Sequence, residues 1–224
     1  MKVLLGTTNP SKVKRFSDLL KGYGIEFVTL RNVKVTGEPE EVGNTPEENA
    51  RIKAAFYGQY FDVVICNDSG LYFEELDFAD LRQPGLKIRT PMNMDRLSDE
   101  EMIAYYSKLI AELGGKVTAY YLDGIAVYHH GVISSFMDNA AARKKGAFYM
   151  IDKPSPKRFA GWPLDSLSIN KENGKYFVDG SVEESKDNII KDQYEKEVVD
   201  FLIQSLHIVR ENLEETQCTY NMRT

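Results

Sequence analysis

The spacing of hydrophobic residues predicts a strand, a helix and a second strand at the start of the chain. Lys2 to Thr8 contains a short apolar run that ends in Gly-Thr-Thr, which is typical of a buried strand. From Ser11 the apolar residues recur at helical spacing, and two glycines then end the pattern. We expect the second strand at Glu26 to Leu30.

Two later helices begin at recognisable capping sequences. Thr45-Pro46-Glu47-Glu48 combines a capping hydroxyl, a proline in the first turn and a capping-box glutamate, so we expect a helix that runs to about Tyr57. Ser98-Asp99-Glu100-Glu101 repeats the capping box ahead of an apolar helical stripe, which Gly114-Gly115 ends. A third amphipathic helix is expected over Asn188 to Leu206.

The remaining apolar runs predict strands. Asp62 to Cys66 is a buried run that ends at Asn67-Asp68-Ser69-Gly70, and Lys116 to Tyr128 and Val132 to Met137 indicate two antiparallel strands around a histidine-glycine turn. Strands and helices alternate early and hairpins follow, which favours an α/β fold with a mixed, twisted sheet flanked by helices. We expect one domain over residues 1–210 and a polar, frayed tail over 211–224.

Composition narrows the class of ligand. The 224 residues carry 28 Lys and Arg against 34 Asp and Glu, a net charge of −6, so we expect no broad nucleic-acid surface. A small phosphorylated ligand needs only a few local cations and backbone N–H groups. The N-terminal apolar patch is too short for a signal peptide or a membrane span, and the two cysteines form no disulfide framework. We therefore expect a cytoplasmic protein with no membrane partner.

One candidate phosphate site lies where the first strand gives way to the first helix, at Thr7-Thr8-Asn9-Pro10-Ser11-Lys12. A helix N-terminus offers unpaired N–H groups and the positive end of its dipole, and Lys12 adds a point charge. The alternative is that Asn9 or Ser11 only caps the helix and that Lys12 is solvated. The segment is neither a P-loop nor a dinucleotide fingerprint, so it does not decide between the two on its own.

Two carboxylates form a candidate metal site. Glu41 precedes the helix that carries Lys53, and Asp68 follows an apolar strand, where α/β sheets usually bind their ligands. Mg²⁺ needs one or two carboxylates and takes its other ligands from water and substrate phosphates. The alternative is that Glu40-Glu41 is a solvated acidic turn and that Asp68 is an ordinary cap.

Three segments together resemble a known family. GTTNPSK, EEVGNTPEENARIKA and NDSGL occur in this order, each at the edge of an expected strand or helix. The combination resembles the inosine triphosphate pyrophosphatase family, whose hallmarks are T-x-N-x-x-K, E-E-T-G-x-T-x-x-E-N-A with a downstream lysine, and D-S-G-L. Gln83-Pro84-Gly85-Leu86 also resembles the family's P-G segment. The close match covers roughly residues 1 to 90.

The resemblance implies two lobes with an active-site cleft between them, and a homodimer. It also implies a nucleoside triphosphate substrate, with deaminated purines such as ITP, dITP and XTP preferred. Lys12 and Lys53 would hold the triphosphate. The expected substrate-binding residues are Thr7, Asn9, Lys12, Lys53, Ser69, Phe159, Trp162 and Lys191. Glu41 and Asp68 would hold Mg²⁺, and Asp68 would orient or deprotonate the water that attacks the α-phosphorus and releases pyrophosphate. Lys12, Lys53 and Asp68 would be the catalytic residues.

The chain departs from the family pattern at three places. Asn67 stands where the family commonly has a second carboxylate. The family's base-binding F-G-[WY]-D-P becomes a segment in which Phe159 and Trp162 remain, but no acid separates the aromatic residue from the proline. Trp162 is expected either to stack on a base or to be a core residue. The family's S-H-R is absent, and Lys186 and Lys191 are the cations nearest its expected position.

Other conspicuous residues favour structural roles. The histidines at 129 and 130 are expected in a solvated hairpin turn, and the basic stretch over residues 143–158 in a solvated loop, with phosphate binding as its alternative. The main competing function is a nucleotide sensor of the same fold with little turnover. A further alternative is a pyrophosphatase that has changed its preferred base.

Overall fold

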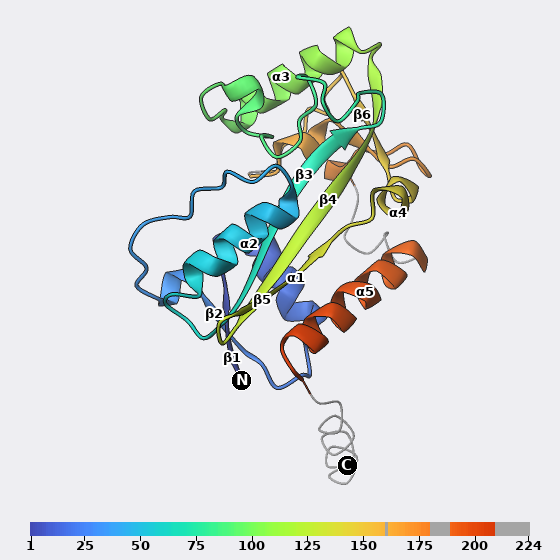
Figure 1. Ribbon diagram of the computed structural model, residues 1–224. Helices are drawn as coiled ribbons and strands as arrows, with labels where there is room; N and C mark the ends of the chain where they lie inside the picture. The colour runs from blue at the N-terminus through green and yellow to red at the C-terminus, as the bar shows by residue number, and fades with distance from the viewer. Residues whose placement is uncertain (160, 180–188, 209–224) are drawn as a thin grey trace. The chain divides into compact units, whose positions relative to one another are not determined.

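The computed structural model describes residues 1–159, 161–179 and 189–208 (Figure 1), and for residues 141, 142, 145 and 189–194 it describes only the backbone. The predicted tail over 211–224 and Lys186 lie outside the described residues. The helices are α1 (Pro10–Leu19), α2 (Pro46–Tyr57), α3 (Asp99–Glu112), α4 (Ala140–Lys145) and α5 (Ile189–Ser205). The strands are β1 (Lys2–Leu5), β2 (Glu26–Thr29), β3 (Val63–Phe73), β4 (Lys116–His129), β5 (Val132–Met137), β6 (Phe148–Ile151) and β7 (Ser168–Ile169).

The strands form one mixed sheet in the order β2-β1-β3-β4-β6-β7, with β5 paired to β4. β1 is parallel to both β2 and β3, whereas the pairs β4–β5, β4–β6 and β6–β7 are antiparallel. The expected α/β fold with a mixed sheet is therefore confirmed. The chain divides into two compact units, one from Met1–Asp68, Asp123–Met137 and the C-terminal part from Asp192, and one from Ser69–Leu122 and Asp138–Lys191.

In the first unit, alternate residues of the strands face two different helices, as the side-chain period of a strand requires. Val3 and Leu5 of β1 pack in a cluster with Phe16 of α1. Leu4, between them, packs in another cluster with Ala54 of α2. Figure 1 shows α2 in front of the strands and α1 behind them. These buried contacts fix α1, whose first turn carries the phosphate candidates, and α2, which carries Lys53.

In the second unit, α3 packs on β6 and on the short 3₁₀ helix η3 (Pro163–Ser166). Its core contains Phe73 of β3, Tyr106 of α3 and Met150 of β6, all of them fully buried. The Ser98 capping box is confirmed, because the Ser98 hydroxyl accepts from Glu101 N and the Glu101 carboxylate accepts from Ser98 N. Three further 3₁₀ helices are η1 (Leu30–Asn32), η2 (Pro91–Asn93) and η4 (Phe177–Asp179).

Two expected strand ends are wrong, and the first strand ends at Leu5 and not at Thr8. The strand expected to end at Cys66 runs on to Phe73, so Asp68 lies within β3 and not at its end. The segment that follows supplies the missing partners: Leu71 N donates to Gly85 O at 3.0 Å, and Phe73 exchanges two hydrogen bonds with the Gln83 side chain. The Gln83 side-chain amide thus makes the hydrogen bonds to Phe73 that a neighbouring strand would otherwise make. The hydrophobic pattern of the sequence does not predict such a contact.

The basic stretch is only partly a loop, because residues 153–158 lie in an exposed loop as expected but its beginning is helical. Arg143 and Lys144 belong to α4 and not to a solvated loop. Arg143 Nε lies 3.0 Å from Asp138 Oδ2 and also donates to Tyr121 O at 3.0 Å.

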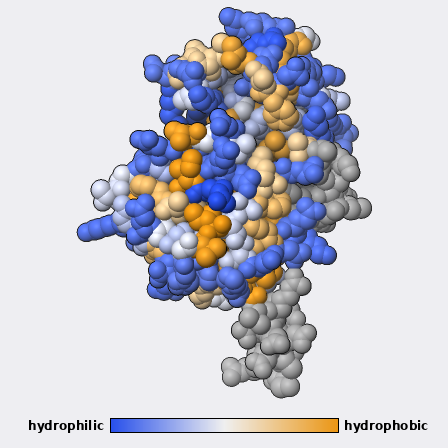
Figure 2. Space-filling model, viewed as in Figure 1, coloured by the Kyte–Doolittle hydropathy of each residue, from blue (hydrophilic) through white to orange (hydrophobic). Residues whose placement is uncertain are grey.

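Within the described part of the chain, no helix is long and apolar enough to cross a membrane. On the face drawn in Figure 2, apolar residues are interspersed with hydrophilic ones.

Candidate active site

The first turn of α1 is built by Asn9 and Pro10. The Asn9 side chain accepts a hydrogen bond from Ser11 N at 2.9 Å, and Asn9 N donates to the Thr7 hydroxyl at 3.1 Å. Pro10 takes the first helical position, where no N–H is needed. The capping role of Asn9 is therefore confirmed. Phosphate binding by Thr7 and Asn9 remains a prediction. Capping by Asn9 does not exclude it, because a cap and an anion site use the same helix terminus.

Lys12 is not a solvated lysine. Its Nζ donates to the backbone carbonyl of Asn67 at 3.3 Å, which directs the ammonium toward β3. Burial lowers the pKa of Lys12, while the nearby carboxylate of Asp68 opposes this shift and the positive charge of Lys53 adds to it. The structure thus brings two cations and one carboxylate of the predicted site together.

Lys53 joins the two predicted metal ligands. Its Nζ lies 2.7 Å from Glu41 Oε2 and 3.0 Å from Asp68 Oδ1. The Lys53 and Asp68 side chains are only 11% and 15% exposed, whereas that of Glu41 is 43% exposed. Burial alone would lower the pKa of Lys53, but Asp68 and Glu41 outweigh burial and raise it, so the ammonium stays charged at neutral pH. Asp68 is therefore not a simple cap, whereas Glu41 is exposed but paired with Lys53.

Asn49 is a member of this cluster that the sequence did not identify. Its side chain is buried, its Nδ2 donates to Asp68 Oδ2 at 2.9 Å, and its Oδ1 accepts from Gly43 N at 2.8 Å. A signal was present, because Asn49 lies four residues before Lys53, and positions four apart share one face of a helix. The helical spacing from the predicted Lys53 could therefore have identified Asn49 as a residue on the same face.

The start of α2 is held against β4 by a glycine. A Cβ at Gly124 would overlap the backbone of Pro46 and Glu47, so only glycine permits this approach. Thr45 caps the helix as expected by accepting from Glu48 N at 3.1 Å. The Glu48 carboxylate, however, accepts from Asn44 N at 2.6 Å, one residue earlier than in a capping box. These contacts set the position of the helix that carries Asn49 and Lys53.

Asn67 has a different role from its neighbour. The residue is buried, and its Nδ2 donates to the carbonyl oxygens of Asp68 and Gly124, both at 3.0 Å. Its Oδ1 is buried and has no hydrogen-bond partner among the described residues. A carboxylate could not make the two donations, since an ionised carboxylate only accepts. The amide at this position therefore ties β3 to β4.

A second ion pair lies nearby in the same unit. Arg15 of α1 donates to Asp123 Oδ2 of β4 at 2.7 Å. The Asp123 side chain is almost fully buried, and its charge acts to raise the pKa of Lys12. Cys66, on β3 just before Asn67, is buried, and burial raises the pKa of its thiol.

The remaining predicted residues belong to the second unit or to α5. Ser69 follows Asp68 on β3 and belongs to the second unit, as do Phe159 and Trp162. Trp162 is 42% exposed, which excludes the alternative of a core tryptophan. Three residues later, Asp165 is partly buried, and burial raises its pKa to about 6. Lys191 belongs to α5, but its side chain is outside the part of the structure that is described.

The geometry fits a hard divalent cation such as Mg²⁺. Glu41 and Asp68 converge on one ammonium, so their oxygens face a common point. Hard cations prefer carboxylate oxygens, and Mg²⁺ needs only one or two from the protein. Across the residues that the structure describes, no group of three or more His, Cys, Asp or Glu side chains could hold a metal.

The Ham1 family model matches residues 3–145, which is more than half of the sequence. The chain belongs to the Ham1 family. This membership confirms the resemblance to the inosine triphosphate pyrophosphatases that the N-terminal motifs indicated.

Curated relatives of this Ham1 chain share its sequence over part of their length. The dITP/XTP pyrophosphatase of Thermoanaerobacter pseudethanolicus is 39% identical over 87 residues, which cover 38% of this chain and 42% of the relative. The dITP/XTP pyrophosphatase of Bacillus subtilis is 38% identical over 76 residues, 34% of this chain and 38% of the relative. The chain thus spans about two fifths of these relatives.

Solved structures extend the likeness of fold to nearly the whole Ham1 chain. The Ham1 protein of Staphylococcus aureus aligns with a TM-score of 0.66 over 90% of this chain and 98% of its own, at 19% identity. A HAM1 protein from Coxiella burnetii aligns with a TM-score of 0.68 over 91% of this chain and 99% of its own, at 20% identity. At such identities the likeness concerns the fold.

Proposed function

We propose that this Ham1 chain hydrolyses a nucleoside triphosphate, preferably a deaminated purine nucleotide such as ITP, dITP or XTP, to the monophosphate and pyrophosphate. The proposal rests on one observation above all: Lys12, Lys53, Glu41 and Asp68 converge within the first unit. The names of the dITP/XTP pyrophosphatases that it resembles support the reaction and the substrate class.

The basic and acidic residues of the site have different roles in the proposed reaction. Lys12 and Lys53 bind the phosphate oxygens, and the N–H groups at the start of α1 add hydrogen bonds to them. Asp68 accepts the proton of the attacking water, whose oxygen forms a bond to the α-phosphorus as the bond to the bridging oxygen of pyrophosphate breaks. Such a reaction depends mainly on positioning and charge neutralisation, which this cluster supplies.

Glu41 and Asp68 would hold Mg²⁺, which when bound neutralises phosphate charge and orients the phosphates. The Lys53 ammonium, which contacts both carboxylates here, would also supply positive charge to the substrate phosphates. Trp162 is the proposed stacking surface for the base, because it is exposed and is the single tryptophan of the chain.

The test is pyrophosphate release from ITP, dITP, XTP, GTP, ATP, CTP and UTP, with Mg²⁺ and with EDTA. Wild type is compared with Asp68→Asn and with Asp18→Asn, a control that removes an exposed carboxylate on α1. We expect Mg²⁺-dependent release from ITP or XTP in wild type and in Asp18→Asn, and its loss in Asp68→Asn.

The other results separate the competing functions. Release only from a different base would keep the reaction and show that the base pocket has changed its preference. Nucleotide binding without release from any member of the panel would overturn the proposed enzyme and support the sensor. Asn67, in place of a carboxylate, is the observation that favours the sensor.

A further inference from the structure

We propose that Asn49 is a positioning residue that holds Asp68 and the loop of Glu41 in one fixed arrangement, an inference that rests on the proposed function. The amide uses both of its ends: Nδ2 donates to Asp68 Oδ2 at 2.9 Å, and Oδ1 accepts from Gly43 N at 2.8 Å. Gly43 lies two residues after Glu41, so one side chain connects both acidic segments.

The position requires an amide. The side chain must donate in one direction and accept in the other, and among side chains of this length only asparagine has both groups in fixed geometry. An aspartate would still accept from Gly43 N but would place an oxygen against Asp68 Oδ2. A hydrophobic residue would leave a buried backbone N–H and a carboxylate oxygen without these partners.

The loop is shaped to bring its backbone close to Asn49. A Cβ at Gly43 would lie 2.7 Å from Asn49 Oδ1 and 2.9 Å from Asn49 N, closer than such atoms can approach. Glycine at 43 therefore permits the hydrogen bond that a larger residue would prevent. This hydrogen bond restricts the motion of the loop at Gly43, two residues after Glu41. Glu41 is the more exposed of the two carboxylates.

The consequence is a carboxylate held from two sides. Asp68 Oδ2 is bound by Asn49, and Asp68 Oδ1 is bound by Lys53. Both donors come from α2, four residues apart, so the helix delivers them as one rigid face. Rotation of the Asp68 carboxylate requires that both bonds break. Asn49 acts through Asp68 and Glu41 and does not itself contact the reacting atoms.

Two substitutions separate the functions of the amide. Asn49→Asp keeps the acceptor for Gly43 N and removes the donor to Asp68, whereas Asn49→Ser shortens the side chain and removes both bonds. Asn44→Asp is the matched control, because Asn44 is exposed in the same segment and its side chain makes no described hydrogen bond. Circular dichroism and thermal melting establish that each variant is folded.

Two readouts are compared. With ITP and Mg²⁺ we expect kcat to fall about 10- to 100-fold in both Asn49 variants, with little change in KM, as for loss of the hydrogen-bond partners of metal ligands. Calorimetric titration of Mn²⁺ without nucleotide is expected to show about 10- to 100-fold weaker binding by Asn49→Ser. Asn44→Asp is expected to match wild type in both readouts.

The results distinguish this inference from the proposed function. If folded Asn49→Ser has the kcat and Mn²⁺ affinity of wild type, the positioning role is overturned. If it melts at a lower temperature and loses activity but binds Mn²⁺ like wild type, Asn49 serves the fold alone and the inference is again overturned. If wild type itself releases no pyrophosphate, the proposed function fails, and the Mn²⁺ comparison still decides the role of Asn49.

Discussion

At the scale of single residues, the positive charge of Lys53 offsets the negative charges of the candidate site. Its buried ammonium faces Glu41 and Asp68, whose mutual repulsion it offsets. Lys53→Met keeps the length of the side chain and removes the charge. We expect kcat/KM for ITP to fall about 10²- to 10³-fold, the effect of losing one group that stabilises developing charge, measured by steady-state pyrophosphate release.

Lys14→Met is the control for that substitution. Lys14 is an exposed lysine of α1 that pairs only with Asp18 four residues later among the contacts described for it. Its removal is expected to leave kcat/KM unchanged, because exposed pairs of this kind contribute little. Equal activity of Lys53→Met and Lys14→Met would show that the charge of Lys53 has no part in the reaction.

A second residue, Asn67, bears on stability. Asn67→Asp replaces the Nδ2 donor by an oxygen that faces the carbonyls of Asp68 and Gly124. We expect the free energy of unfolding to fall by about 1–3 kcal/mol, the cost of leaving buried polar groups unpaired, measured by urea denaturation at neutral pH. Asn44→Asp should change it far less, and an equal or higher stability of Asn67→Asp would contradict the tie between β3 and β4.

Some residues of the candidate site could be predicted from the sequence, and one could not. Lys12, Glu41, Lys53 and Asp68 could be found because their motifs stand at the edges of expected elements, and the structure brings them together. Asn49 was missed although it lies within one of those motifs. A buried amide is recognised by the two groups it connects, and Gly43 and Asp68 become its neighbours only in the folded chain.

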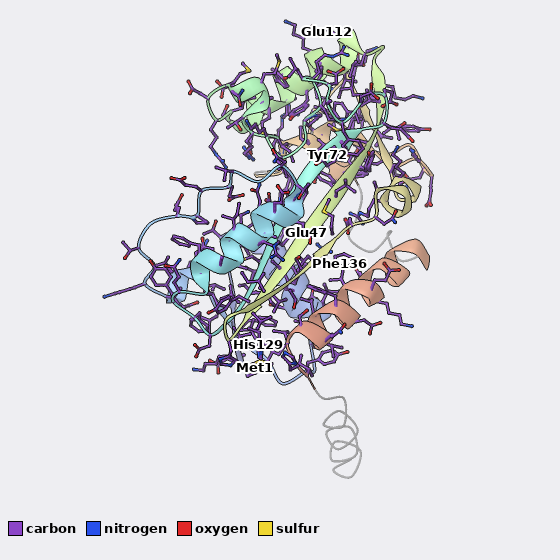
Figure 3. All side chains as sticks on the ribbon, in the orientation of Figure 1. Met1, Glu47, Tyr72, Glu112, His129 and Phe136 are labelled. Atoms are coloured by element: carbon purple, nitrogen blue, oxygen red, sulfur yellow. The ribbon has the colours of Figure 1, made fainter. Side chains whose placement is uncertain are left out.

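At the scale of elements, the contact between α2 and β4 sets the geometry of the site. Glu47, labelled in Figure 3, lies in the first turn of α2, and Gly124 of β4 faces its backbone. Gly124→Ala forces the two elements apart and moves Asn49 and Lys53 with the helix. We expect a loss of about 1–3 kcal/mol or more in the free energy of unfolding.

The control is Gly146→Ala, where the nearest atom to a new Cβ is Arg143 O at 3.7 Å, an ordinary contact. Urea denaturation measures the stability of both variants, and pyrophosphate release is expected to fall only in Gly124→Ala. A Gly124→Ala variant as stable and active as Gly146→Ala would show that the close approach of helix and strand is dispensable.

The turn between β4 and β5 brings together the three histidines of the chain. The His129 ring lies 4.8 Å, centroid to centroid, from both His130 and His207. Burial lowers the pKa of His129, and the two neighbouring rings lower it further. Figure 3 shows His129 at the same end of the first unit as Met1. The expected solvated turn is confirmed, since His130 and Gly131 form an exposed turn, and His129 in addition contacts two other histidine rings.

This cluster predicts a dependence of stability on pH. An unfolded histidine has a pKa of about 6.5, and the folded value of His129 is lower, so the unfolded chain binds the proton more tightly. Stability is therefore complete above about pH 6.5 and declines as the pH falls below it. In urea denaturation, His129→Gln should lose less stability than wild type between about pH 7.5 and about pH 5.5. The same decline in both proteins would contradict the role of His129.

Elements also differ in how well their sequence predicts them. The capped helices α2 and α3 and the strand β5 lie where their patterns placed them. The continuation of β3 to Phe73 could not be foreseen, because Gly85 and the Gln83 side chain pair with it after a loop. The helix α4 is short and basic, and its order depends on contacts such as Arg143 with Asp138.

At the scale of the whole molecule, two strands belong to both compact units. The first unit ends at Asp68 and the second begins at Ser69, within β3, and the boundary between Leu122 and Asp123 falls within β4. Domains that unfold separately are usually joined by exposed linkers where few contacts cross. Here the boundaries fall inside continuous strands, which favours unfolding as one cooperative system.

The single tryptophan makes this cooperativity measurable. Trp162 belongs to the second unit, whereas Gly124 belongs to the first. In urea we expect Trp162 fluorescence and far-UV circular dichroism to follow one transition, the usual test of two-state unfolding. We also expect Gly124→Ala to lower the midpoint of both signals equally, because a strain in one unit is then shared by the whole chain. A fluorescence transition that stays in place while the dichroism transition moves would show that the units unfold independently, despite the strands that run through both.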